Sequence, residues 1–336
     1  MVIVFALAAA VLYGSADFLG GAASRRIRAL SVLAVSAPAG VVVLLAAALL
    51  AGGPPVMAGV PWAVAAGAAG GAGLIIFYAG LAAGPMRVVA PVSAVVSTVL
   101  PVGVAVATGE RPGPAVYAGG LVCVLATVLV SVDLGGRPAR RGGPRGRPPS
   151  CRGGVPPLGA ERRSGGPGGR PPSCRGGVPP LGAERRSGGP GGRPPGLTVS
   201  RGLAYGIGAG IAFGLFFTFL RVAATSGVLW PSALSRAAGA VVPLAMAVWA
   251  GAPPAWRGAS RRVLAAVVGS GLLDATANVC YVLATRAGLF GIAVVLTSLY
   301  PGVTVLLARL VLGERLRPAQ LAGLILAIAG IAVVSV

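Results

Sequence analysis

The sequence predicts an all-α polytopic membrane protein, with ten transmembrane helices arranged as two inverted five-helix repeats. Its 336 residues are 55% hydrophobic and only 10% charged, whereas soluble globular chains carry roughly 25% charged residues. Between Arg28 and Arg87 the chain has no Asp, Glu, Lys or Arg. A segment that crosses lipid in such a chain has to be a helix of about 20 residues, because its backbone groups must bond to one another.

A turn that occurs twice predicts the repeat. Gly109-Glu110-Arg111 ends one apolar run, and Gly313-Glu314-Arg315 ends another. Residues 109–131 aligned with 313–335 share nine identities in 23 positions, and each copy leads into a final apolar helix. Two diverged copies of one unit follow from this pattern.

Glycines, prolines and charges divide the apolar sequence into ten spans. The spans lie near residues 2–22, 30–51, 60–82, 87–108, 114–132, 202–221, 229–250, 263–285, 289–311 and 318–336. Each repeat, 1–134 and 201–336, holds five of them. Because five is odd, the second repeat has to enter the membrane from the opposite face, as in many secondary transporters.

Residues 135–200 are predicted to form a disordered linker rich in Arg, Gly and Pro. Arg147–Gly169 is repeated without change as Arg170–Gly192, a 23-residue tandem duplication with no apolar face to bury. The 28 basic residues are all Arg and fourteen of them lie in 137–201, so much of the net charge of +21 is concentrated there. The segment is either a neutral spacer, which we favour, or a basic segment that binds anionic lipid or nucleic acid.

The arginines of the short loops predict the orientation of the chain in the membrane. The loops between spans 1–2, 3–4, 7–8 and 9–10 hold nine of them, whereas the other face holds Arg111, Arg286 and Arg221. The positive-inside rule therefore places the linker in the cytoplasm and both termini outside. The first apolar run lacks a basic start and a cleavage site, so we expect an uncleaved helix in a multi-pass protein of the cell (inner or plasma) membrane.

With these features the sequence resembles the EamA family of the drug/metabolite transporter superfamily. The resemblance rests on two five-helix units, on Tyr13-Gly14 in the first span, and on a proline followed by Gly-Glu-Arg in spans 4 and 9 (Pro101 to Glu110, Pro301 to Glu314). It covers roughly 1–134 and 201–336. Family members often carry an Arg early in helices 2 and 7. Here Arg236 matches in helix 7, and Ser36 stands at the other place. The resemblance implies transport of amino acids or related metabolites, often as export.

Polar residues on one face of span 8 are the best candidates for the lining of a transport path. Asp274 and Asn278 are four residues apart and share a helix face, and Tyr281 and Thr285 continue it. An ionisable group inside a span costs at least about 2.5–3.5 kcal/mol, so it normally faces a cavity or a partner. The alternative is hydrogen bonding between helices alone.

Asp17 and Arg236 are the other intramembrane candidates. Asp17 lies near one end of span 1, where it either binds a substrate or proton or sits at the membrane interface. Arg236 either neutralises Asp274 or holds a substrate carboxylate through two hydrogen bonds, and snorkelling to the interface is its structural alternative.

Glu110 and Glu314 precede the last helix of each repeat and are predicted to be structural caps. A carboxylate at that position offsets the positive end of the helix dipole and accepts hydrogen bonds from free N–H groups. Pro114 and Pro318 fit the first turn of those helices, where no N–H is needed. Substrate contact by the two glutamates is the less favoured alternative.

Enzyme chemistry finds little support in the sequence. There is no His, which removes the commonest general base and metal ligand. The four Cys have no metal-site spacing, and no phosphate-binding loop is present. We therefore expect no catalytic residues, no cofactor and no metal.

The expected function is a secondary transporter, or permease, that exports small amino-acid-like metabolites as one five-helix unit rocks against the other. Its expected partners are a small-molecule substrate, the lipid bilayer, and protons as coupling ion through Asp274 or Asp17; nucleic acid is not expected. The sequence does not distinguish between a monomer and a homodimer. The alternative class is a membrane scaffold whose basic linker binds anionic lipid or nucleic acid, and an intramembrane aspartyl protease ranks third.

Overall fold

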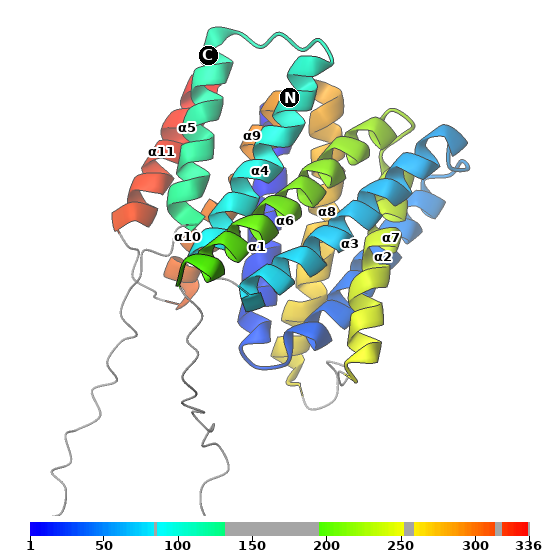
Figure 1. The fold of residues 1–336 in the computed structure, drawn as a ribbon. Helices are drawn as coiled ribbons and strands as arrows, with labels where there is room; N and C mark the ends of the chain where they lie inside the picture. The colour runs from blue at the N-terminus through cyan, green and yellow to red at the C-terminus, as the bar shows by residue number, and fades with distance from the viewer. Residues whose placement is uncertain (84–85, 132–194, 252–258, 313–317, 335–336) are drawn as a thin grey trace, which may run out of the picture. The chain divides into compact units, whose positions relative to one another are not determined.

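The computed structural model describes residues 1–83, 86–131, 195–251, 259–312 and 318–334. Regular structure in these ranges is entirely helical, and they contain no strand. Figure 1 shows the elements, which are α1 (Val2–Ser24), α2 (Ala29–Leu50), η1 (Met57–Gly59), α3 (Val60–Ala83), α4 (Met86–Ala107), α5 (Pro114–Ser131), α6 (Pro195–Ala224), α7 (Leu229–Trp249), α8 (Arg261–Ala287), α9 (Phe290–Thr297), α10 (Tyr300–Leu312) and α11 (Pro318–Val334).

The helices agree with a multi-pass membrane protein. Eight spans of the described chain are long and apolar enough to cross a membrane, and α9 with α10 makes one of them. The apolar helices α5 and α11 are shorter than these eight. One boundary differs from the sequence prediction: α6 begins at Pro195, so its first six residues belong to the predicted linker 135–200. Proline fits the first turn of a helix. The rest of the predicted linker lies outside the described residues.

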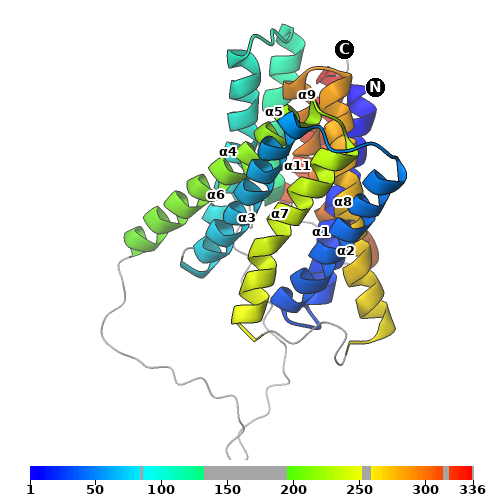
Figure 2. The same cartoon turned by 90° about the vertical axis from the view of Figure 1, so that its right-hand side faces the viewer.

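The two sequence halves are interleaved rather than packed as separate bodies. The most extensive helix contacts join α3 to α6, α1 to α8, α5 to α11 and α4 to α6, each pairing one helix from either half. Figure 1 places α5 and α11 at one edge and α2 with α7 at the other, and Figure 2 shows α3 between α6 and α7. Consecutive helices, such as α1 and α2 or α6 and α7, contact each other much less.

The contacts divide the centre into two groups of helices. We call α3, α4 and α6 the first bundle, because α6 packs along both of the others. We call α1, α8, α9 and α10 the second bundle, because α1 packs along the other three. The two bundles meet mainly where α4 contacts α9 and where α6 contacts α8. Each bundle therefore contains helices from both halves of the sequence.

Small residues allow the central helices to approach closely. A Cβ added at Gly14 of α1 would come within 2.6 Å of the Tyr300 carbonyl oxygen of α10, so only glycine fits there. The buried cluster between the bundles is built largely from alanines together with Leu220, Tyr281 and Phe290. Large apolar side chains instead lie exposed on outer helices, for example Val42 (64%) on α2 and Ile328 (70%) on α11. This distribution is the one that a lipid solvent favours.

The ninth predicted span is broken in the middle. α9 ends at Thr297 and α10 begins at Tyr300. Pro301 has no N–H, so it cannot bond to the Thr297 carbonyl one turn earlier, and Gly302 bonds instead to the carbonyl of Leu299. The Thr127 hydroxyl of α5 lies 3.3 Å from the Ser298 carbonyl that the break exposes. This span is also the most buried of the eight.

Candidate functional site

The polar face of α8 meets three helices in turn, α7, α1 and α6. Asp274 lies 13 residues from each end of α8 and is therefore its central residue. Asn278 and Tyr281 follow it at one-turn intervals toward the C-terminal end of the helix. Each of these three side chains contacts a different helix. In this structure the predicted polar face of α8 is therefore used for contacts between helices.

Asp274 and Arg236 form an ion pair between α8 and α7. Their side chains keep 28% and 23% exposure respectively, and no other described residue bonds to the Asp274 carboxylate. Neutralisation of Asp274 by Arg236, one of the two roles predicted for this arginine, is the arrangement present here. The pair is therefore not fully buried, and it presents both signs of charge at one point.

The next two residues on this face of α8, Asn278 and Tyr281, are buried between helices. The Tyr13 hydroxyl of α1 donates to the Asn278 side-chain oxygen, and Asn278 is fully buried with its amide nitrogen unpaired among the described residues. One turn further, the Tyr281 hydroxyl donates to the Phe217 carbonyl of α6 at 3.0 Å. Tyr281 is also fully buried. In this structure Asn278 bonds to α1 within the second bundle and Tyr281 bonds to α6 of the first, and their contact with a substrate stays a prediction.

Asp17 stands apart from these contacts. It lies on α1 one turn beyond Tyr13, its side chain is exposed, and no described residue bonds to it. It is near enough to Tyr300 of α10 and Tyr78 of α3 to interact electrostatically with both. The structure therefore places Asp17 close to the aromatic residues of the centre but does not bring it into the Arg236–Asp274 pair.

A pocket lies at the break between α9 and α10. The cavity is small, with a volume of about 10 Å³, which is close to the minimum that holds one water molecule. Hydroxyl groups from three parts of the chain line it, namely Ser97, Thr98, Thr127, Ser298 and Tyr300. The apolar residues Ala94, Phe217, Val294 and Pro301 complete the wall. The pocket is thus polar on one side, lies between α4 of the first bundle and α9–α10 of the second, and carries no charged group.

The turn after α4 is shaped so that it presents Glu110. Gly109 has φ +98°, a conformation that favours glycine. Its N–H bonds to the Val106 carbonyl, and the N–H of Glu110 bonds to the Ala105 carbonyl. These two bonds make the paired pattern that commonly ends a helix at glycine, and they fix the position of the next side chain.

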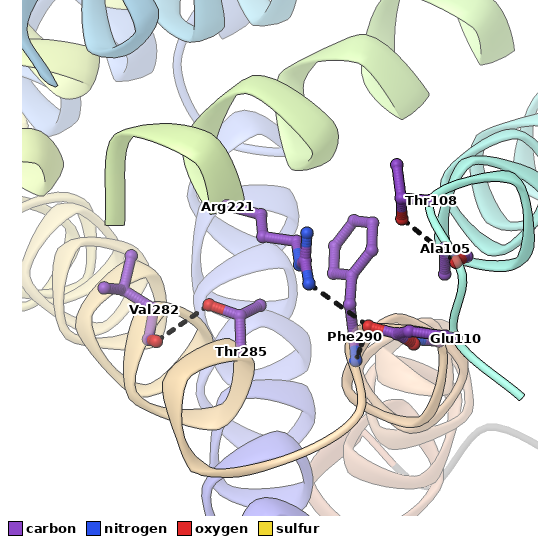
Figure 3. Close-up of polar contacts among 8 residues, drawn as sticks. Ala105, Thr108, Glu110, Arg221, Val282, Thr285 and Phe290 are labelled. Atoms are coloured by element: carbon purple, nitrogen blue, oxygen red, sulfur yellow. Dashed lines mark hydrogen bonds and ion pairs between the residues drawn. The ribbon is translucent and has the colours of Figure 1, made fainter. Parts of the chain in front are cut away.

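The Glu110 carboxylate reaches the N-terminus of α9. One oxygen accepts from the Phe290 N–H at 2.9 Å and the other from the Gly291 N–H at 3.1 Å. Arg221, in the last turn of α6, lies 3.2 Å from the same carboxylate, and its guanidinium stacks on the Phe290 ring at 4.7 Å. Figure 3 shows this convergence of three helix ends.

This geometry differs from the role that the sequence assigned to Glu110. The prediction placed the carboxylate on the helix it precedes, α5, whereas the structure directs both oxygens to α9 of the other half. Glycine aims the side chain backward across the bundle rather than along the chain. Glu314, the predicted cap of the second half, lies outside the described residues.

The sequence also missed the break at Ser298–Leu299 and the bond from Tyr13 to Asn278. Pro301 inside an apolar run was the available signal for the break, but other prolines, Pro91 and Pro101, lie within continuous α4. No local signal identifies Asn278 as the partner of Tyr13, which is 265 residues away. Among the described residues no group of His, Cys, Asp or Glu could hold a metal ion.

A comparison with known protein families shows which family the C-terminal part of the chain resembles. Residues 200–336, which comprise α6 to α11 apart from the first turn of α6, match the model of the EamA-like transporter family. This C-terminal segment is similar to EamA-like transporters. Members of this family in the drug/metabolite transporter superfamily are membrane transporters, which agrees with the eight membrane-length spans.

The fold beyond the EamA half is also shared with a solved structure. One that is described only as a crystal structure of a protein covers 99% of this chain and 95% of its own, with a TM-score of 0.67. The two sequences are 17% identical, so the likeness concerns the fold alone. No curated protein matches the chain in sequence.

Proposed function

We propose that the chain is a secondary transporter that exports small amino-acid-like metabolites by alternating access. The observation that carries this proposal is the span broken at 298–299 beside a polar pocket. Secondary transporters build their sites near the middle of the membrane from interrupted helices, because unwound backbone is tolerated there only where it lines a cavity. The EamA assignment of residues 200–336 gives the same class.

The Arg236–Asp274 pair supports a zwitterionic substrate. An amino acid brings a carboxylate for the Arg236 guanidinium and an ammonium group for Asp274, so it can replace each partner of the ion pair with a group of equal charge. An anion would leave Asp274 without a cation, and isolated charges are costly within a membrane. Both side chains remain partly exposed, as exchange of partners requires.

The interleaved packing suggests that the two bodies that move against each other during transport are not the two halves of the sequence. Rocking of 1–134 against 201–336 would have to separate the most extensive helix contacts of the molecule, α3 with α6 and α1 with α8. Rocking of the first bundle against the second preserves both. We therefore propose that alternating access opens and closes the junction between the two bundles.

Ten spans in two inverted repeats remain part of this proposal. The shorter helices α5 and α11 have 18 and 17 residues, at the low end of the roughly 17–25 residues that cross a bilayer. Figure 1 supports opposite directions for corresponding helices, because α1 starts at the end of the bundle where α6 finishes. A cytoplasmic reporter signal from a fusion after Val336 would contradict external termini.

Flux measurements test the function. Purified full-length protein in liposomes should take up labelled zwitterionic amino acids above protein-free vesicles, with matched amines and matched carboxylic acids as comparison substrates. A series of pH gradients tests the proton as coupling ion, and inside-out vesicles test export. Flux no greater than in protein-free vesicles for every metabolite would overturn the proposal. No observation on the described residues favours a membrane scaffold.

A further inference from the structure

We propose that Glu110, Arg221 and the first two N–H groups of α9 form a gate that closes the transport path at one end of the bundle. The inference rests on the proposed function, because a gate needs a path. We use "gate" for the Glu110 carboxylate, the Arg221 guanidinium and the N–H groups of Phe290 and Gly291. All of these groups lie at helix ends: after α4, in the last turn of α6 and at the start of α9.

The gate joins the two bundles at the ends of α4 and α9, the helices through which they chiefly meet. Glu110 and Arg221 follow or belong to helices of the first bundle, whereas Phe290 and Gly291 open α9 of the second. The bundles meet mainly through α4 with α9 and α6 with α8. A second bond crosses at the same end, from the Arg286 side chain of α8 to the Ala224 carbonyl that ends α6, at 3.2 Å.

The carboxylate is held by charge-assisted bonds in a protected place. Glu110 is only 12% exposed at its side chain, and Arg221 is 34% exposed. The positive end of the α9 dipole favours a negative group there. A hydrogen bond to a charged group contributes more than one between neutral groups. Separation of the bundles at this end must break the two hydrogen bonds that α9 donates to this carboxylate, so the gate favours the closed arrangement.

The polar residues of α8 between the gate and Asp274 are buried as well. Along α8, the fully buried Tyr281 and Asn278 separate the gate from Asp274. Asp274 and Arg236 nevertheless keep partial exposure. Access to that pair in this structure therefore comes from elsewhere than the gate end. The structure corresponds to the state in which the gate end is shut, which is the external end on the predicted orientation.

A carboxylate is the side chain that this position requires. It offers two acceptor oxygens for two backbone N–H groups and a negative charge for the arginine. If Glu110 and Arg221 formed only an ion pair, exchanging the two residues would preserve it. The gate would not be preserved, because an arginine at 110 has no acceptor for the N–H groups of α9. The double variant E110R/R221E therefore distinguishes a gate that caps α9 from an ion pair alone.

The experiment measures access to the pocket from each face of the membrane. The four cysteines are replaced, and Ser97, which lines the pocket on α4, is changed to Cys as a reporter. A membrane-impermeant maleimide is added to sealed vesicles that hold the full-length chain. We expect E110A to raise the labelling rate from the gate face about tenfold or more, with smaller rises for E110Q and R221Q. The E110R/R221E variant should stay as accessible as E110A.

A matched control is available on the same helix. Arg201 is exposed near the opposite end of α6, so R201Q should label at the parent rate. If E110A does not fold, E110Q, which keeps the side-chain volume, decides the matter. Parent rates in E110Q and R221Q would overturn the gate, and parent rates in E110R/R221E would overturn the capping of α9. Because labelling needs no substrate, its result is independent of the flux test.

Discussion

Among the residues that the structure describes, two arginine–carboxylate pairs lie in the helical core, and they differ in place and in use. Arg236 and Asp274 join α7 to α8 at the middle of α8, within one half of the sequence, and both side chains stay partly exposed. Arg221 and Glu110 join the two halves at helix ends, and Glu110 is nearly buried. Position along the membrane normal therefore separates the two pairs.

The bonding of the carboxylates differs in the same sense. No described residue other than Arg236 bonds to Asp274, so this carboxylate keeps capacity for a ligand. Both oxygens of Glu110 are engaged by backbone N–H groups and one also by Arg221. Similar residue types can thus make a site that exchanges partners or a contact that holds helices together, and the number of engaged oxygens distinguishes the two.

The largest effect should come from the central pair. The variant D274N leaves Arg236 without a counter-charge inside the membrane, so we expect flux in proteoliposomes to fall about a hundredfold. The double variant R236Q/D274N removes both charges and should recover thermal stability but not flux. Flux equal to the parent at every pH tried for D274N would remove Asp274 from the path.

The gate pair should affect stability more than substrate affinity. E110A frees two N–H groups of α9 and leaves Arg221 unpaired, so we expect the free energy of unfolding to fall by about 2 kcal/mol. Denaturation of the purified protein measures this loss. The comparison between the pairs would fail if E110A weakened substrate binding as strongly as D274N does.

A smaller effect is expected from loss of the hydrogen bond between Tyr13 and Asn278. Y13F removes the hydroxyl that donates to Asn278, and a net loss of about 1 kcal/mol in stability is expected. The matched control is Y117F, because Tyr117 of α5 is 48% exposed and should tolerate the same change. Equal thermal melting curves for both variants would argue against a structural contribution of this bond.

The smallest effect is expected for the basic linker. Deletion of 137–193 leaves α6 intact from Pro195, and flux per correctly inserted molecule should match the parent. A spacer without a role of its own has this property. Lost flux with normal insertion would instead give the linker a part in transport and favour the scaffold alternative.

The sequence was sufficient for helix positions and insufficient for helix partners. Apolar runs bounded by Gly, Pro and Arg predicted α2 as 30–51 and α4 as 87–108, within a residue or two of Ala29–Leu50 and Met86–Ala107. Composition decides these boundaries because lipid requires apolar helices. Partners between helices depend on tertiary packing, which explains why the role predicted for Glu110 was assigned to α5 while its carboxylate lies on α9.

The candidate residues illustrate the same limit. The one-face spacing of Asp274, Asn278 and Tyr281 was visible in the sequence, and in the structure these residues contact α7, α1 and α6 respectively. Which of them stays open was not visible, because exposure depends on Tyr13 and Phe217, which are contributed by distant helices. Spacing predicts a shared face, and packing decides whether that face meets a cavity or another helix.

The most direct test is ligand-dependent stabilisation of three matched proteins. The parent, D274N and E110Q are melted with and without the amino acid that stabilises the parent most, since a ligand stabilises the state that it binds. We predict that the stabilisation disappears in D274N and persists in E110Q, which melts lower without ligand. Stabilisation that persists in D274N, or that is lost in E110Q alone, would contradict a central binding pair with a separate gate.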